Sequence, residues 1–281
     1  MKNPISILFL SVLLVGCSSA RNPDGTIIGN PDDPLEGMNR KLYSFNKTLD
    51  DAVLKPVTKG YQKITPNFMQ RGISNFFNNL RLLPSIVNGI FQFDGHGVTM
   101  NTGRLIMNST LGVGGILDLA TPSGLDPHYN DFGQTLAVWG VRQSSYLMIP
   151  FYGPSTIRDG VGIFVDRSFL SVWPYIESDR LYWGLTVLNM VDTRSKQLKN
   201  EGAMKAAALD EYAFIRDAYL QYRAHQINRA LGKDTDDLDE DSSDFDLVGD
   251  TVEEGDAKVK VETKPQALPK VSPQMQPAAV K

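Results

Sequence analysis

Apolar side chains recur along much of this chain at spacings of three and four residues, which is typical of amphipathic helices. The first stripe consists of Leu35, Met38, Leu42, Phe45 and Leu49. Just before it, Asp33, Pro34 and Glu36 have the order of an N-cap, a first-turn proline and a capping-box acid. We therefore predict a helix that starts at Asp33. Its apolar stripe fits two environments, a protein core or membrane lipid.

Further helices are indicated later in the chain. Thr65-Pro66 begins a segment with a face of Met69, Ile73, Phe76 and Leu80, and Leu83-Pro84 begins another that ends before Asp94-Gly95. A last stripe runs from Leu209 to Arg223, and Gly232 marks its stop. Strand evidence is thin, because prolines flank 151–153 within "SSYLMIPFYGP" and favour an irregular segment. The pattern predicts a mostly α protein, with one domain of short amphipathic helices broken by proline and glycine.

The N-terminus has the pattern of a bacterial lipoprotein signal. Its apolar run, "ISILFLSVLLV", has 11 residues, whereas roughly 18–20 are needed to span a bilayer. Cys17, the only cysteine, follows "LLVG", so we expect cleavage before it and acylation (diacylglyceryl and palmitate) of the new terminus. Ser18, where an aspartate would favour retention at the inner membrane, is typical of lipoproteins sent to the outer membrane. No later apolar run is long enough for a transmembrane helix.

Charge divides the chain further. The net charge is −4, yet residues 232–281 hold 13 acidic and 6 basic residues. Such a segment, acidic and then proline-rich, buries too little apolar surface to fold, so we predict a disordered tail. It lacks the spacing of a calcium loop. We assign 1–16 to a signal peptide, 17–32 to a lipidated tether, 33–231 to the helical domain and 232–281 to the tail. The body has no basic stripe, which argues against nucleic acid.

Catalytic motifs are absent from the sequence. No Gly-x-Ser-x-Gly elbow occurs, and the three histidines are His96, His128 and His225. His96 and His128 have aspartates nearby, but without a placed nucleophile we interpret them as turn residues. No His-Glu-x-x-His or clustered ligand spacing predicts a metal site. We therefore expect no enzyme activity, no metal and no cofactor apart from the lipid on Cys17.

The most unusual stretch is "NSTLGVGGILDLATPSGLD", residues 108–126. Its glycines resemble a phosphate loop, but Leu117 stands where Gly-x-Gly-x-x-Gly needs its third glycine, and no Lys-Ser/Thr follows. Two interpretations remain. The stretch is either a hairpin buried in the core or an apolar segment that contacts lipid.

Six segments carry a family likeness over about residues 33–232. They are DPLEGMNRKLYSFN (33–46), SNFFNNLRLLPSIVN (74–88), RLIMNSTLGVGGILDLA (104–120), DFGQTLAVWGV (131–141), YLMIPFYGPSTIRDGVG (146–162) and IRDAYLQYR (215–223). Together they resemble the MlaA lipoprotein family, also called VacJ. The tether and the acidic tail lie outside the likeness.

The resemblance implies a membrane-embedded helical ring around an amphipathic channel, anchored in the inner leaflet of the outer membrane on its periplasmic face. It implies retrograde phospholipid transport, which maintains lipid asymmetry: misplaced outer-leaflet phospholipid passes through the channel to the periplasmic carrier MlaC. A trimeric porin of the OmpC/OmpF type is the expected partner. Bends of the ring are expected at Pro56, Pro66 and Pro84. The alternatives are a structural lipoprotein that only braces porins and a lipid hydrolase.

Two sets of site residues are expected on the same basis. A gating hairpin at the channel rim would comprise Leu111, Gly112, Val113, Gly114, Gly115, Ile116, Leu117 and Leu119. Contacts with the lipid headgroup are expected from Arg104, Arg142, Arg158 and Arg216, each within or beside a family-like segment.

Overall fold

The computed structural model describes residues 30–233. The leader, Cys17, most of the tether and nearly all of the tail lie outside the described residues. The elements in chain order are α2 (Glu36–Leu49), η1 (Asp50–Leu54), α3 (Lys55–Ile64), α4 (Asn67–Phe91), α5 (Gly95–Thr110), η2 (Thr121–Ser123), α6 (Phe132–Val138), β1 (Tyr146–Ile149), β2 (Gly153–Thr156), α7 (Ile157–Val165), η3 (Asp166–Leu170), η4 (Trp173–Tyr175), α8 (Asp179–Ala207) and α9 (Glu211–Ala230). The predicted mostly helical class is confirmed.

The first helical stretch is longer than its sequence pattern suggests. α2, the π-helical η1 and α3 follow one another without a break from Glu36 to Ile64. Pro56 lies in the first turn of α3 and causes no interruption there. The break comes at Thr65, which is extended because Pro66 follows it, and Pro66 then N-caps α4. The predicted cap at Asp33 is wrong, since Leu35 is the N-cap and the Asp33 carboxylate binds Asn39 and Tyr212.

The predicted helix start at Leu83-Pro84 is also wrong. α4 runs through Pro84 as one helix of 25 residues. Leu82, Ser85 and Gly89 are buried on both sides of the proline, where α4 packs against α5. That packing continues past Pro84 and outweighs the hydrogen bond that a helical proline removes, a loss of about 3 kcal/mol.

Two strands replace the irregular segment that the prolines favoured. β1 and β2 form an antiparallel hairpin in which Met148 lies opposite Pro154. Pro154 is tolerated because β2 is an edge strand of a two-stranded sheet. All four residues of β1 are buried, and Tyr146 and Met148 form the main apolar cluster together with Tyr212 of α9.

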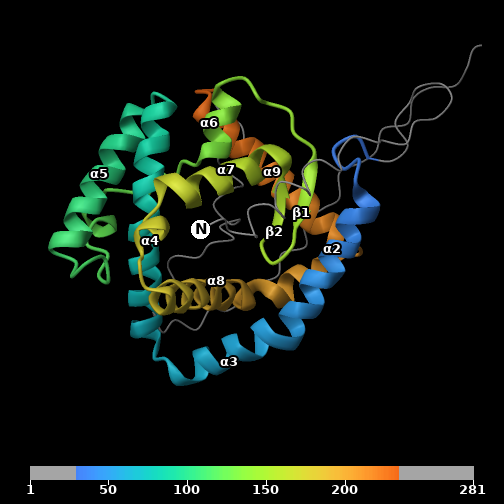
Figure 1. Cartoon of the computed structure of the whole chain (residues 1–281), viewed down its shortest axis with the longest axis horizontal. Helices are drawn as coiled ribbons and strands as arrows, with labels where there is room; N and C mark the ends of the chain where they lie inside the picture. Colours follow the sequence, from blue (N-terminus) through green and yellow to red (C-terminus); the bar gives the residue numbers. More distant parts are fainter. Residues whose placement is uncertain (1–29, 234–281) are drawn as a thin grey trace, which may run out of the picture. The chain divides into compact units, whose positions relative to one another are not determined.

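Neighbouring elements form a closed circuit within residues 30–233. α3 packs on α8, α8 on α4, α4 on α6, α6 on α9, and α9 on β2; β1 then contacts α2, which leads back through η1 to α3. Figure 1 shows α3 and α8 side by side, with α4 running across their ends. The final helix matches its prediction: α9 covers the Leu209–Arg223 stripe apart from its first residue, and Gly232 ends it with φ of 63°.

The distribution of side chains is inverted relative to a water-soluble domain. Among the described residues 10 hydrophobic and 21 polar or charged side chains are buried, while 30 large hydrophobic side chains are exposed. Large exposed apolar patches mark contact sites for proteins, ligands or membranes. Within residues 30–233 no helix is both long enough and apolar enough to cross a bilayer.

Candidate functional site

The loop that follows α5 is built from successive turns. Its backbone amides bond within the loop or to the end of α5: Gly114 to the Ser109 carbonyl, Gly115 to that of Asn108, and Leu117 to that of Gly112. Val113, Gly114 and Gly115 have φ of 54°, 70° and 90°, a left-handed run that glycine favours. The loop is therefore a compact turn and has no strand pairing.

Polar side chains fasten this loop at its base. Asn108 accepts from the amides of Leu119 and Ala120 and donates to Asp118 (3.0 Å). On the other side, Asn75 of α4 donates to the Ile116 carbonyl (3.1 Å), and Asn79 donates to Ser109 Oγ (3.0 Å). Hydrogen bonds thus hold the backbone of the loop and its base. The apolar side chains of the loop are not needed for this and can contact another surface.

Those side chains point outward. Leu111, Val113 and Leu117 are 68%, 64% and 50% exposed, and Ile116 and Leu119 are also exposed. The alternative of a hairpin buried in the core is therefore wrong. Of the predicted hairpin residues Gly112 and Gly115 are buried, Gly112 against the loop's own backbone and Gly115 against Asn79 of α4. Their gating role stays a prediction.

The four predicted arginines lie in two environments. Arg104, Arg158 and Arg216 are each at least nine-tenths buried and paired with Asp118, Asp159 and Asp33 or Asp217, respectively. Arg104 also donates to Thr121 and to the Leu125 carbonyl. Cations buried against carboxylates hold segments together and offer few accessible donors to a ligand.

Arg142 differs from the other three. It is exposed, lies in the loop between α6 and β1, and forms no ion pair with a carboxylate in 30–233. Arg158 donates to the carbonyl oxygens of Val141 and Arg142 (3.3 and 3.0 Å), so a buried arginine holds the loop that carries an exposed one. Among the four predicted residues, Arg142 is the one whose guanidinium is free for a headgroup.

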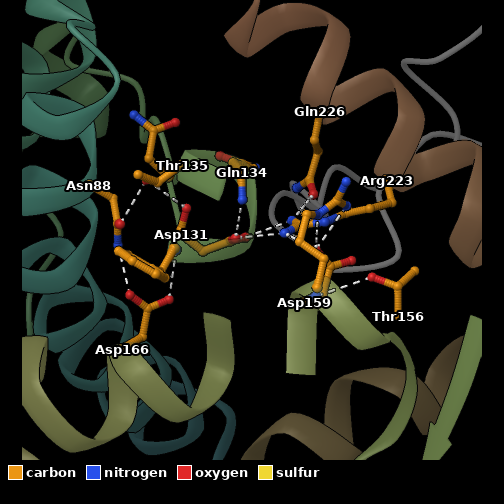
Figure 2. A network of polar contacts seen from close by, with 12 residues as sticks. Asn88, Asp131, Gln134, Thr135, Thr156, Asp159, Asp166, Arg223 and Gln226 are labelled. Carbon is orange, nitrogen blue, oxygen red and sulfur yellow. Dashed lines mark hydrogen bonds and ion pairs between the residues drawn. The ribbon is translucent and has the colours of Figure 1, made fainter. Parts of the chain in front are cut away.

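A polar network that the sequence did not single out joins α6, α7 and α9. Arg223 of α9 binds both carboxylate oxygens of Asp131 (2.6 Å each) and Asp159 Oδ1 (2.9 Å), as Figure 2 shows. Tyr219 adds a bond to Asp159 Oδ2 (2.9 Å). The two arginines, Arg158 and Arg223, hold the pKa of Asp159 below its usual range despite its burial. These residues all lie in the family-like segments at 131–141, 146–162 and 215–223. That location was the one feature of the sequence that could have pointed to the network.

Asp166 lies at the other side of the same network. It accepts from Asn88 (2.7 Å) and from the amide of Phe132 (3.0 Å), while Thr135 bonds the other end of the Asn88 amide (2.9 Å; Figure 2). Burial raises the pKa of Asp166 to about 6, and the nearby negative charge of Asp131 adds to this. α4, α6 and η3 are thus joined through one carboxylate that titrates close to neutral pH.

The histidines are placed structurally. His128 Nε2 lies 3.0 Å from Asp94 Oδ2, but Asp94 also N-caps α5 and accepts from Asn130. The serine beside His128, Ser85, donates to its carbonyl oxygen (3.0 Å) and makes no bond to the ring. Burial lowers the pKa of His128. His128 and Asn130 thus support Asp94 as the N-cap of α5, and this arrangement contains no activated nucleophile. The described residues hold no group of three or more potential metal ligands.

Exposed apolar side chains gather on several elements. They include Val57 and Ile64 of α3 with Phe68 and Met69 of α4, the 111–119 loop, Ile157, Val161 and Phe164 of α7, and Leu181, Trp183, Val187 and Met190 of α8. Phe91 and Phe93 add to them, with Trp139, whose indole donates to the Phe91 carbonyl (3.2 Å). We refer to the 30 exposed large hydrophobic side chains together as the apolar surface.

Known proteins match this chain over its helical body. The model of the MlaA lipoprotein family matches residues 31–226. Proteins named intermembrane phospholipid transport system lipoprotein MlaA, from Shigella flexneri and Escherichia coli (strain K12), are each 34% identical over 232 residues, which is 79% of this chain and 87% of theirs. The protein of the same name from Haemophilus influenzae is 29% identical over 234 residues, 81% of this chain and 91% of its own.

A solved structure agrees with these relatives. It comes from work on the structural basis for maintenance of bacterial outer membrane lipid asymmetry. It is 33% identical to this chain, covers 70% of it and 99% of its own length, and superposes with a TM-score of 0.62. The family model spans the residues that carry the fastened loop and the polar network, and this chain belongs to the MlaA lipoprotein family.

Proposed function

We propose that this protein is an outer-membrane lipoprotein that transports phospholipid. It would take misplaced phospholipid from the outer leaflet through an amphipathic channel and pass it to a periplasmic carrier of the MlaC type. The observation that carries the proposal is the inverted distribution of side chains, in which 30 large hydrophobic residues are exposed around a polar interior. Acyl chains of a lipid suit the exposed hydrophobic residues, and lipid headgroups suit the polar interior. The names of the Shigella and Escherichia relatives support a role in phospholipid transport.

The mode of membrane attachment follows from the same surface. A body without a spanning helix but with apolar outward side chains fits one leaflet, where acyl chains cover it from the side. A lipid on Cys17 would keep the body at the inner leaflet of the outer membrane. Several acyl chains, at about 0.8 kcal/mol per buried methylene, anchor a protein stably. A trimeric porin of the OmpC/OmpF type is the partner proposed for access to the outer leaflet.

The site residues take specific roles in this proposal. The apolar tip of the 111–119 loop would contact acyl chains at the channel rim and gate their passage. Arg142 would meet the headgroup, since it is exposed and unpaired within 30–233. Arg104, Arg158 and Arg216 would shape the site through their ion pairs. No covalent step is needed, which agrees with the structural use of His128 and Ser85.

Outer-leaflet composition tests the transport function. Deletion of the gene is expected to raise surface phospholipid and sensitivity to detergent with EDTA, and the wild-type gene should restore both. A variant Arg142→Gln should restore less than a matched Arg180→Gln variant, which changes an exposed arginine in the first turn of α8. Unchanged surface phospholipid after deletion would leave a porin brace as the remaining function. Release of fatty acid by the purified protein would point to a hydrolase.

A further inference from the structure

Arg167 of η3 is held in place by neutral side chains. Its Nη2 donates to the Tyr182 hydroxyl (3.1 Å) and to Thr186 Oγ1 (3.3 Å), both on α8. Ser171 shapes the turn that follows, because its hydroxyl donates to the Arg167 carbonyl (2.9 Å) and accepts from the Trp173 amide (3.4 Å). The guanidinium carbon lies 5.0 Å from the Trp173 ring centroid and 5.7 Å from that of Tyr182. Groups from η3, η4 and α8 thus orient one guanidinium.

The charge of Arg167 is not compensated by a carboxylate within residues 30–233. Arg167 is exposed, and its donors on Nε and Nη1 make no hydrogen bond to the described part of the chain. The adjacent acid, Asp166, is engaged elsewhere, since it accepts from Asn88 (2.7 Å) and from the Phe132 amide (3.0 Å). Arg167 therefore differs from the arginines that are buried against carboxylates, namely Arg104, Arg158, Arg216 and Arg223.

Aromatic rings continue from this arginine into the apolar surface. Trp173 meets Tyr182 edge-on with centroids 5.9 Å apart, and Tyr182 meets Trp183 in the same way at 5.4 Å. Trp183 is exposed, and so is Phe169, two residues after the arginine, whose ring contacts that of Phe164 on α7 (6.3 Å). An uncompensated cation thus adjoins side chains that the proposed function places in lipid.

This combination of groups matches the boundary between acyl chains and water in a leaflet. Tryptophan and tyrosine are enriched at that level of a membrane, and arginine extends its charged end toward it while its stem stays on apolar surface. The phosphodiester of the lipid supplies an anion there. A guanidinium that stacks on rings keeps its donor edge for an oxyanion, and its forked donors match phosphate oxygens.

We propose that Arg167 binds the phosphodiester of a phospholipid in the surrounding leaflet, while Trp173 and Tyr182 orient its guanidinium. Arg167 lies on η3, whereas Arg142, the headgroup contact of the proposed function, lies in the loop between α6 and β1. The inference rests on the part of the proposed function that places the apolar surface in lipid. A lipid bound at Arg167 would hold the body at a fixed depth in its leaflet.

Trp173 provides a local reporter for this site. The chain has three tryptophans, so Trp139→Phe and Trp183→Phe leave Trp173 as its single tryptophan. The full lipidated protein with these two changes is titrated in detergent with a short-chain phosphatidylcholine that carries a nitroxide on its headgroup. The nitroxide quenches Trp173 when the lipid binds beside Arg167. Arg167→Gln should weaken this binding about tenfold, because hydrogen bonds from a charged donor are lost.

Three further variants are made in the same protein. Arg229→Gln, which changes an exposed arginine of α9, is the matched control and should bind the labelled lipid like the parent protein. Arg167→Lys keeps the charge but loses the planar fork and should weaken binding about threefold. Tyr182→Phe removes a hydroxyl that orients the guanidinium and should also weaken binding about threefold. Together with Arg167→Gln it should add no further loss; an equal loss in both backgrounds would contradict its role as a positioning residue.

Unlabelled competitors identify the group that is bound. Short-chain phosphatidylglycerol should displace the labelled lipid at a lower concentration than the matching diacylglycerol, and Arg167→Gln should abolish this difference. Diacylglycerol that competes equally well in the parent protein would overturn the proposal, as would equal affinity of the parent protein and Arg167→Gln. Inorganic phosphate that competes at the same concentration as phosphatidylglycerol would assign the site to free phosphate and overturn the lipid assignment.

This test can fail separately from the test of transport by gene deletion. If the labelled lipid does not quench Trp173 while deletion raises surface phospholipid, only the site at Arg167 is wrong. If the site behaves as expected and deletion leaves surface phospholipid unchanged, the transport function fails and the lipid site stands.

Discussion

Two adjacent glycines of the 111–119 loop differ in what surrounds them. Gly114 and Gly115 both have positive φ, but a Cβ on Gly114 would meet nothing within 4 Å, whereas one on Gly115 would lie 2.6 Å from Asn79 Cβ. Gly114→Ala should lower the free energy of unfolding by about 1 kcal/mol, the cost of a left-handed alanine. Gly115→Ala should lower it by about 2–4 kcal/mol, because overpacking is added. Denaturant unfolding in detergent measures both.

Gly37→Ala is the control for this pair. Gly37 lies inside α2 with nothing within 4 Å of an added Cβ, so alanine there should stabilise the protein by about 0.5–1 kcal/mol. Equal stability of the Gly114 and Gly115 variants would mean that the loop moves away from Asn79 at little cost. In transport assays the strained variant should be the more impaired, if the loop has to adjust to passing lipid.

Asp166 should give stability an unusual pH dependence. Its pKa of about 6 in the fold exceeds the roughly 3.9 of an unfolded aspartate, so the native state binds more protons between these values. The stabilising contribution is complete below about pH 4 and is lost as pH rises to about 6. Asp166→Asn removes the titration. The difference in unfolding free energy between wild type and variant should fall from pH 4 to 6 and then level off. A constant difference would show an ordinary pKa.

The sequence did not show which of the four predicted arginines pair with carboxylates. Arg104, Arg158 and Arg216 were assigned to headgroups, yet the structure pairs each with a carboxylate. Arg216 lies beside Asp33, 183 positions earlier, and no local pattern shows such a partner.

Among the elements, α9 depends most on a single charged residue. Arg223 connects it to the N-cap residue of α6 and to α7 through Asp131 and Asp159. Arg223→Met leaves the partly buried Asp131 without its cation and the buried Asp159 with Arg158 alone. It should lower the free energy of unfolding by about 3–5 kcal/mol. Arg229→Met, an exposed change on the same helix, should stay within about 0.5 kcal/mol. Similar losses for both variants would show that the network contributes little.

Helices were predictable from three- and four-residue spacing, but their limits were not. Pro84 looked like a boundary because its local effect is strong, and packing of α4 on α5 overrode it. The β1–β2 hairpin was missed because Pro150 and Pro154 argue against strands, while the amide of Asn46, which fastens the turn, comes from a distant helix. Local signals fail where a long-range contact satisfies the backbone.

For the whole molecule, the apolar surface should be in contact with acyl chains. Trp139 and Trp183 are 56% and 57% exposed, whereas Trp173 is partly covered by Arg167 and Tyr182. In proteoliposomes, single-tryptophan variants with Trp139 or Trp183 should be quenched strongly by brominated phospholipid, and one with Trp173 less. Strong quenching by acrylamide in water, with none by brominated lipid, would place the apolar surface outside the bilayer.

The polar interior of residues 30–233 has a thermodynamic consequence. Heat capacity rises on unfolding chiefly because buried apolar groups become hydrated, and it usually increases by about 12–15 cal/mol/K per residue. Here 30 large hydrophobic side chains are exposed before unfolding and asparagines such as Asn39, Asn88 and Asn101 fill the interior. Calorimetry in detergent should therefore give a smaller increase per residue. The free energy of unfolding would then change little with temperature, because hydrogen bonds contribute more to this fold than the burial of apolar groups does.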